Sequence, residues 1–395
     1  MKNIKLLLVA LLFSLIPAQL IRLQLTQTGA ITTSDILVAT IDCFFICYIL
    51  LNKIALKLPK IIILAFLFLL SAFTSTIIAL NVFSLTQVLT ASFFMIRLAA
   101  YILISVVTIN VINKTEVEKW IKILVGVGII FATAGVMQFL FFPNLTPLQS
   151  FGWDPHVFRL VSTTLDPNYT GMILTFFATL TTSIYLFKKH KIYIFLTAFF
   201  IGAILLTFSR SSYLAILISM LAIGSIKSPK TFLIAISFFI LSFIFVPQVR
   251  NRITGAFLID ETANARIISW QKALIIFKDN PLFGVGYDTY RFAQTKYGFI
   301  QNSPDSGGHS GAGVDSSFLF VLATTGVVGF SFFLVMVISL MKVSMKNAKN
   351  NYLSLAFFAS FTALLFHTQF VNSFMFPQIM LIFWFLVGLL YVSNY

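Results

Sequence analysis

Charge is what this sequence lacks most. Only 10% of its 395 residues are charged, whereas 59% are hydrophobic. An ordinary soluble domain carries about a quarter of its residues as charged groups, which it needs to cover a water-facing surface. The composition therefore excludes a soluble globular protein and indicates a protein that crosses a membrane many times.

Cysteine and metal-ligand motifs are also scarce. The two cysteines, Cys43 and Cys47, lie one helical turn apart in an apolar run, where they fit small packing residues. The sequence has no paired histidine and cysteine spacing and no nucleotide-binding glycine loop, and Gly284-Val-Gly286 lacks the third glycine of a dinucleotide fingerprint. We therefore expect no metal and no cofactor.

What is present is a series of apolar runs, each of roughly 18 to 25 residues and so long enough to cross about 30 Å of hydrocarbon as a helix. They predict an all-α polytopic membrane protein of about 12 transmembrane helices in one integral membrane domain, residues 1–395. Lys2 and Lys5 before the first run resemble a secretory signal, but Pro17-Ala18-Gln19 is a poor cleavage site, so we expect an uncleaved first helix. The predicted spans are 5–25, 32–51, 61–80, 89–112, 121–142, 169–187, 192–208, 212–226, 231–248, 316–341, 352–371 and 376–392.

Lysines gather in alternate loops between these spans. By the positive-inside rule those loops and both termini are cytoplasmic. Most of the net charge of +15 then reflects topology, and no basic stripe interleaved with aromatics indicates a nucleic-acid partner. The lysines concerned are Lys2, Lys5, Lys53, Lys57, Lys60, Lys114, Lys119, Lys122, Lys188, Lys189, Lys191, Lys227, Lys230, Lys342, Lys346 and Lys349.

Arginines follow the opposite pattern and fall on or near the outer side, with Arg97 inside the fourth predicted span. Because the guanidinium fork binds phosphate and carboxylate in a bidentate way, this pattern predicts an outward site for an anionic or diphosphate-bearing substrate. The alternative is ordinary ion pairs with loop aspartates, above all for Arg250, Arg252 and Arg291. The outward arginines are Arg22, Arg159, Arg210, Arg250, Arg252, Arg266 and Arg291.

Three of these arginines stand where a charge is costly unless it is paired or liganded. Arg159 precedes a polar turn that ends at Asn168, Arg210 lies in a very short link between two spans, and Arg266 begins an amphipathic run. Ser209, Ser211 and Ser212 around Arg210 show no base signature and are expected to bond backbone groups at helix ends. Asp42 and Arg97, in neighbouring spans, are expected to form a buried pair.

The longest polar segment, residues 249–315, is predicted to be a large extracytoplasmic loop. Ile267, Trp270, Leu274 and Phe277 share one helical face and predict a short amphipathic helix at the membrane surface, stopped at Pro281. The glycines that follow suit tight turns and close backbone approach to a ligand. The other long outer loop, residues 142–168, is expected to pack beside it.

His309 and Asp315 close this loop. A histidine near its ordinary pKa can take a proton from a hydroxyl nucleophile, and the carboxylate can orient the histidine or act as the base itself. The alternative is a solvated loop histidine beside an aspartate that caps the next helix.

Taken together, these motifs resemble the O-antigen polymerase and O-antigen ligase superfamily. The resemblance covers roughly residues 60–390 and is most specific between 159 and 330. Each motif is short, but their order and topological placement fit the family. The motifs are Arg159 to Asn168, Phe208 to Ser211, Arg266 with Trp270, Pro281 to Gly286, and His309 to Asp315 followed by Thr325 to Gly329.

The resemblance implies a metal-independent, inverting glycosyltransferase that uses undecaprenyl-diphosphate-linked glycans at the outer face of the bacterial plasma membrane. Arg159, Arg210 and Arg266 match the family's diphosphate-binding arginines, and His309 is the nearest match to its loop histidine. Where the family often has that histidine, this chain has Asp315-Ser316-Ser317, so either His309 or Asp315 is the expected base. Arg97, Arg291 and Tyr287 are expected accessory residues.

We therefore expect a polymerase of polysaccharide repeat units in the cell envelope. Its partners would be a lipid-linked oligosaccharide donor, a glycan acceptor, membrane lipids and other glycan-assembly proteins. A ligase that moves finished glycan to a lipid or protein acceptor is the alternative within the family. A polytopic transporter is the alternative of another class, for which only Asp42 and Arg97 offer a site near the midplane.

Overall fold

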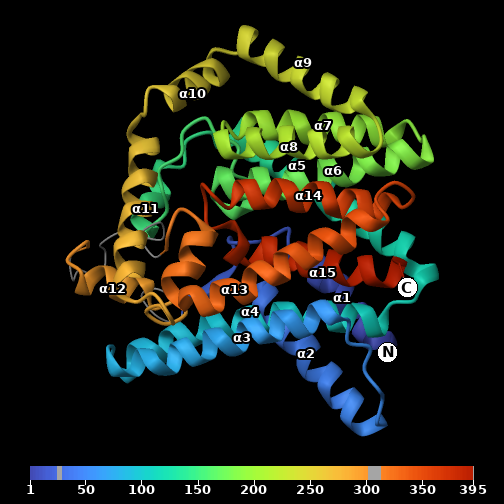
Figure 1. The fold of residues 1–395 in the computed structure, drawn as a ribbon. Helices are drawn as coiled ribbons and strands as arrows, with labels where there is room; N and C mark the ends of the chain where they lie inside the picture. Colours follow the sequence, from blue (N-terminus) through green and yellow to red (C-terminus); the bar gives the residue numbers. More distant parts are fainter. Residues whose placement is uncertain (25–28, 301–312, 395) are drawn as a thin grey trace.

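A computed structural model describes residues 1–24, 29–300 and 313–394. The chain is a bundle of α-helices with one short two-stranded sheet (Figure 1). The helices are α1 (Lys2–Phe13), α2 (Thr33–Asn52), α3 (Lys60–Ile78), α4 (Leu85–Val111), α5 (Val117–Phe141), α6 (Pro167–Lys188), α7 (Ile192–Leu206), α8 (Arg210–Ile226), α9 (Pro229–Phe245), α10 (Pro247–Phe257), α11 (Glu261–Asp279), α12 (Tyr290–Lys296), α13 (Ser317–Lys346), α14 (Tyr352–His367) and α15 (Pro377–Asn394). The strands are β1 (Arg22–Gln24) and β2 (Ala30–Thr32).

The polytopic all-α prediction is confirmed. Within the described residues, α2 to α6, α13 and α15 are long and apolar enough to cross a membrane, and α9 with α10, bent by 101°, can count as an eighth span. Helices α7, α8 and α14 are apolar but shorter. Each predicted span contains a helix, whereas the count of about 12 spans stays a prediction.

Helix α1 is shorter than the predicted first span of 5–25. It ends at Phe13, and the hydroxyl of Ser14 donates to the carbonyl of Leu11 and shares a hydrogen bond of 2.8 Å with Ser34. Pro17 cannot continue a helix because it lacks an N–H. The chain then enters β1, which pairs antiparallel with β2.

The two most enclosed helices are α6 and α15. In their most apolar windows 89% and 83% of the residues are buried, respectively. Helix α6 carries buried threonines, and their hydroxyls donate to carbonyls of the preceding turn, as Thr175 does to Gly171 and Thr179 to Thr175. Such back-bonding satisfies polar groups where water is absent. The core can therefore bury these threonine hydroxyls without charged partners.

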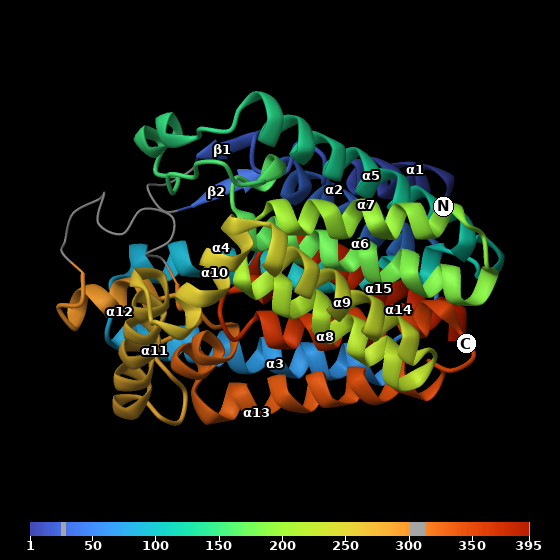
Figure 2. The same ribbon diagram turned by 90° about the horizontal axis from the view of Figure 1, so that it is seen from above.

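Lysine-rich segments gather at one end of the bundle. Lys5 of α1 lies 2.6 Å from Glu116, and Lys227 after α8 donates to the carbonyl of Lys349 at 3.0 Å. Figure 1 and, from above, Figure 2 show both termini at this end and α11 and α12 at the opposite end. The structure thus separates the lysine end from the end that carries the polar loops. Which end faces the cytoplasm stays a prediction from the positive-inside rule.

The predicted surface helix corresponds to α11, which ends at Asp279, two residues before Pro281. The predicted 249–315 loop also contains α10 and α12. The apolar face differs in part from the prediction, because Leu274 is 40% exposed while Ala273 and Ile276 are buried. The helix turns these two small or branched residues inward and leaves Leu274 outside.

A break in α13 is held by the glycine segment before α12. Gly326 has φ 63° and ψ −169°, inside the span of α13. The backbone of residues 281–286 lies across this break: Val327 N–H donates to the Pro281 carbonyl at 2.8 Å and Gly286 N–H to the Thr324 carbonyl at 3.0 Å. The predicted close backbone approach is present, but the partner is the backbone of α13 and not a ligand.

Candidate functional site

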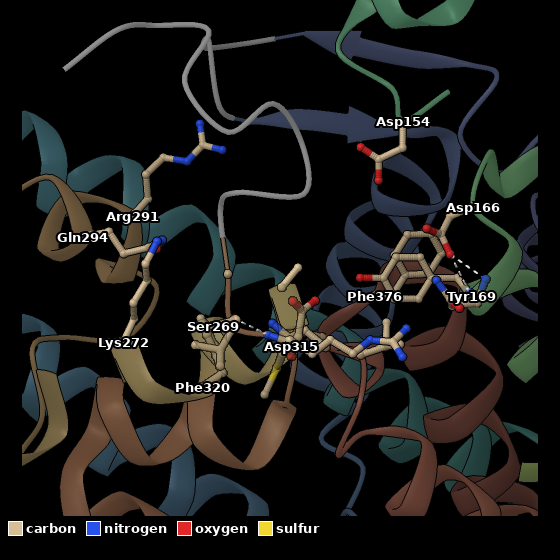
Figure 3. Close-up of a pocket in the computed structure, with 18 of the residues that line it drawn as sticks. Asp154, Asp166, Tyr169, Ser269, Lys272, Arg291, Gln294, Asp315, Phe320 and Phe376 are labelled. Atoms are coloured by element: carbon tan, nitrogen blue, oxygen red, sulfur yellow. Dashed lines mark hydrogen bonds between the residues drawn. The ribbon is translucent and has the colours of Figure 1, made fainter. Parts of the chain in front are cut away.

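One pocket of about 640 Å³ lies at the end of the bundle opposite the lysines. Its walls come from α4, the loop before α6, α11, α12, and the segments before α13 and α15 (Figure 3). The two long loops that the sequence predicts to be outer, residues 142–168 and 249–315, therefore both contribute. The wall includes Tyr169 and Phe376, whose rings stack at 3.9 Å. The lining residues with titratable side chains other than tyrosine are Asp154, His156, Asp166, Arg266, Lys272, Asp288, Arg291 and Asp315.

The polar turn before α6 is joined to the link between α7 and α8. Arg159 Nε donates to the Thr207 carbonyl at 3.0 Å and its Nη2 to the Phe208 carbonyl at 3.3 Å. At the other end of the turn, Ser209 Oγ donates to Asn168 Oδ1 at 2.7 Å. Two motifs that the sequence analysis assigned to one site therefore do meet.

Arg159 itself holds this junction. Its guanidinium is directed at carbonyl groups and does not line the pocket. Burial, with a further contribution from Arg252, lowers the pKa of Arg159 to about 10. The guanidinium groups of Arg159 and Arg252 together create a positive field beside the pocket. Two of the Arg159 donors are already bonded to backbone carbonyl groups.

Arg210 forms a bidentate ion pair. Its Nη1 and Nη2 lie 3.0 Å and 2.9 Å from the two carboxylate oxygens of Asp260. Asp260 also caps α11, because its Oδ1 accepts the N–H of Ala263 at 3.0 Å. Arg210 therefore ties the start of α8 to the start of α11 and is not among the residues that line the pocket.

Arg266, the third predicted diphosphate ligand, lines the pocket on α11. Within the described part of the chain, its side chain forms no hydrogen bond and no ion pair. Burial lowers its pKa, and the nearby Asp315 opposes that shift. A half-buried guanidinium that lines a pocket is suited to an anionic ligand.

Asp315 is fixed through its backbone, which leaves its carboxyl in the pocket (Figure 3). Its N–H donates to Ser269 Oγ at 3.0 Å, and its carbonyl accepts the indole N–H of Trp270 at 2.9 Å. The cap of α13 is Ser316, whose hydroxyl accepts the N–H of Leu319 at 3.3 Å. The alternative reading of Asp315 as a helix cap is therefore wrong.

The electrostatics of Asp315 suit a general base. Burial raises its pKa, Arg266 opposes that shift, and Asp166 and Asp154 reinforce it. A carboxylate with a raised pKa is a stronger proton acceptor than an exposed one. The positive charge of Arg266 and a hydrogen bond from the Ser269 side chain both favour the ionised form of the Asp315 carboxyl and so lower its pKa.

We predict a pH dependence from this shift. A base must be ionised, so the reaction should be lost as pH falls through the pKa of Asp315, and the acid limb should lie above the ordinary aspartate value of about 3.9. Turnover of the purified protein measured across about pH 3 to 8 checks this expectation. An acid limb at or below the ordinary aspartate value would contradict the assignment.

Asp154, His156 and Asp166 are the residues that come nearest to a metal site. One donor atom from each lies within 4.8 Å of the others. His156 is buried, its Nε2 has no partner in the described residues, and burial with Arg159 lowers its pKa to about 4. Neutral imidazole and two carboxylates are ligand types for divalent metals. The neighbouring arginines oppose a cation there, and the expectation of no metal stays a prediction.

The other predicted residues lie as follows. His309 falls outside the described residues. Arg291 lines the pocket. Tyr287 is buried behind it, where its hydroxyl donates to Met375 Sδ at 3.1 Å.

Arg97 does not pair with Asp42. Its Nε lies 3.0 Å from Asp35 Oδ1, and both carboxylate oxygens of buried Asp42 lack a partner in the described residues. Asp35 is seven residues nearer the start of α2 and thus about 10 Å along the helix axis, level with Arg97. The predicted pair is therefore wrong in its acidic partner.

Sequence reasoning did not identify Lys272, Asp288 or Gln294 as pocket residues. A signal for Lys272 was present, because the α11 residues that line the pocket recur every three or four positions. Those residues include Thr262, Ala265, Arg266, Ser269 and Lys272.

The protein-family comparison matches the O-Antigen ligase family over residues 195–334. This segment runs from α7 into α13 and includes Arg210, Arg266, Asp315 and the glycine segment against Gly326. No curated protein matches the chain. Over this segment, which is about a third of the chain, the sequence is similar to the O-antigen ligase family.

Proposed function

We propose that this protein polymerises lipid-linked oligosaccharide repeat units by metal-independent, inverting glycosyl transfer from undecaprenyl diphosphate at the outer face of the bacterial plasma membrane. The family match supports glycan transfer of the O-antigen ligase and polymerase type in general. The polymerisation, the lipid carrier and the outward orientation go beyond this match and belong to the proposal.

One observation carries the proposal: Arg266 and Asp315 line the same pocket, and neither is consumed by an ion pair within the described residues. The acceptor hydroxyl would give its proton to the Asp315 carboxylate while its oxygen attacks the anomeric carbon. The bond between that carbon and the diphosphate oxygen breaks on the opposite face, which inverts the configuration. Arg266 would hold the departing diphosphate, whose charge rises as the bond breaks.

The surroundings of Arg266 support an anion at this end of the pocket. Burial is the largest cause that lowers the pKa of Arg266 and of Arg159. The charge of Arg210 lowers that of Arg266 further, against Asp315, Asp166 and Asp260, and the charges of Arg252 and Arg266 lower that of Arg159 further, against Asp166. These guanidinium groups are therefore close enough to repel one another. A diphosphate would relieve that repulsion, whereas a neutral ligand would not.

We predict that Arg266→Gln reduces glycan chain growth by about 10²-fold, because one charge that stabilises the transition state is removed. Arg266→Lys should recover only part of it, since a point charge lacks the bidentate fork. The measurement is the glycan chain-length ladder from cells, together with the amount of lipid-linked single units. Single units should accumulate as long chains disappear.

The exposed Arg250 of α10 provides the control, and Arg250→Gln should leave the ladder unchanged. A normal ladder from Arg266→Gln would remove the proposed diphosphate ligand. A ligase differs from a polymerase only in its acceptor, so transfer of finished glycan to a lipid acceptor would assign the ligase alternative.

A further inference from the structure

Helix α11 places two cations on either side of the proposed base. Its pocket-lining face carries Arg266, then Ser269, then Lys272, at successive turns. At 1.5 Å per residue, Arg266 and Lys272 are about 9 Å apart along the axis. Ser269, midway between them, bonds the backbone of Asp315. The pocket therefore extends beyond the base, away from Arg266.

The far end of the pocket also gathers Arg291 and Gln294. Figure 3 shows Lys272, Gln294 and Arg291 on one side, Asp154 and Asp166 on the other, and Asp315 with Ser269 between them. Lys272 comes from α11, and the other two come from α12. Two separate elements thus bring a cation to the same end.

Lys272 is held in place without an acidic partner. Its Nζ donates to the Phe299 carbonyl at 3.3 Å and lies 5.7 Å from the centroid of the Phe299 ring. No ion pair with a carboxylate occurs for it in the described residues. Burial raises the pKa of Asp288, which also lines the pocket, to about 8, so at neutral pH this carboxyl is largely protonated and adds little negative charge.

The two ends differ in what the proposed reaction requires of them. In an in-line displacement, the leaving diphosphate and the acceptor approach the anomeric carbon from opposite faces. If Arg266 holds the diphosphate and Asp315 the acceptor hydroxyl, then the groups beyond Asp315 contact the rest of the acceptor glycan. Cations at that end would gain little from contact with a neutral sugar, whereas they would form charge-assisted hydrogen bonds with a carboxylate.

We propose that Lys272 and Arg291 form an acceptor subsite for an acidic sugar, whose carboxylate lies beyond the hydroxyl that reacts. This inference rests on the proposed function for the direction of the acceptor. It assigns an acceptor glycan that carries a uronic-acid residue. The repeat unit itself then contains that residue, because each unit becomes the next acceptor in a polymerisation.

Binding of a trisaccharide of galacturonic acid to the purified, full-length protein tests this subsite, with the carboxyl-reduced trisaccharide as the neutral probe. The wild type should prefer the acidic probe. Lys272→Gln should weaken binding of the acidic probe by about tenfold, as expected for one charge-assisted hydrogen bond, and leave the neutral probe unchanged. Lys272→Arg should retain the preference, and Lys278→Gln, at an exposed position of the same helix, should have no effect.

Two results would overturn the subsite. One is equal binding of the acidic and neutral probes by the wild type. The other is a Lys272→Gln variant that loses affinity for geranyl diphosphate instead, since this end would then bind the lipid carrier. Glycan chain growth of Asp315→Asn separates the two proposals. If Asp315→Asn reduces chain growth while the wild type binds both probes equally, the proposed reaction stands and the subsite fails. If chain growth persists in Asp315→Asn while the wild type prefers the acidic probe, the subsite stands and the proposed reaction fails.

Discussion

Replacing Asp315 with asparagine should stop glycan chain growth and leave the protein folded in the membrane. The amide has the shape of the carboxyl but cannot accept the proton, and loss of a general base typically costs about 10²-fold or more in rate. The contacts that fix the residue should persist, because they use its backbone: its N–H on Ser269 and its carbonyl under Trp270. The chain-length ladder, normalised to the amount of membrane protein, measures the effect.

The matched control is Glu261→Gln in the first turn of α11, which removes an exposed carboxylate near the same end. It should leave the ladder unchanged. Long chains from Asp315→Asn would contradict the assignment of the base. If His309→Ala then removes them, the base is His309, the other residue that the sequence offers.

Gly326→Ala should destabilise the protein severely. A side chain at φ 63° and ψ −169° is strained by about 1–3 kcal/mol. In addition, its Cβ would overlap the carbonyl oxygen of Leu282. This oxygen is backbone and cannot move aside without breaking the hydrogen bonds that clamp residues 281–286 to α13. We therefore expect a loss of more than about 3 kcal/mol, seen as a lower unfolding temperature in detergent and less protein in the membrane.

Gly202 of α7 is the control for this substitution. A Cβ there would meet nothing within 4 Å, and an alanine in a helix is favoured over glycine by about 0.5–1 kcal/mol. Gly202→Ala should therefore unfold at the same temperature or slightly higher. Equal stability of the two variants would mean that the clamp between residues 281–286 and α13 contributes little.

The sequence predicted the elements of the site well because they depend on local patterns. Apolar runs specify helices, and Asn280-Pro281 ends α11 close to where the pattern indicated. The short link around Arg210 and the polar turn after Arg159 were both expected at one site, and Arg159 joins them. The unequal distribution of lysine and arginine corresponds to the two ends of the bundle.

The sequence did not predict which arginine faces the pocket. Arg159, Arg210 and Arg266 have similar neighbourhoods in the chain, yet the first donates to carbonyl groups, the second pairs with Asp260, and only Arg266 lines the pocket. The choice depends on how far one helix is shifted along another, which spacing within one helix does not determine. In the same way, the placement of α2 against α4 pairs Arg97 with Asp35 and leaves the Asp42 carboxyl without a partner in the described residues.

Reconstitution tests the account most directly. The purified protein is placed in liposomes with lipid-linked repeat units on the face that its pocket occupies, and a metal chelator is present throughout. The account predicts long glycan chains with release of the polyprenyl diphosphate, and no chains from Asp315→Asn. Transfer of unextended lipid-linked units across the bilayer, with no new glycosidic bond, would contradict it and favour a transporter.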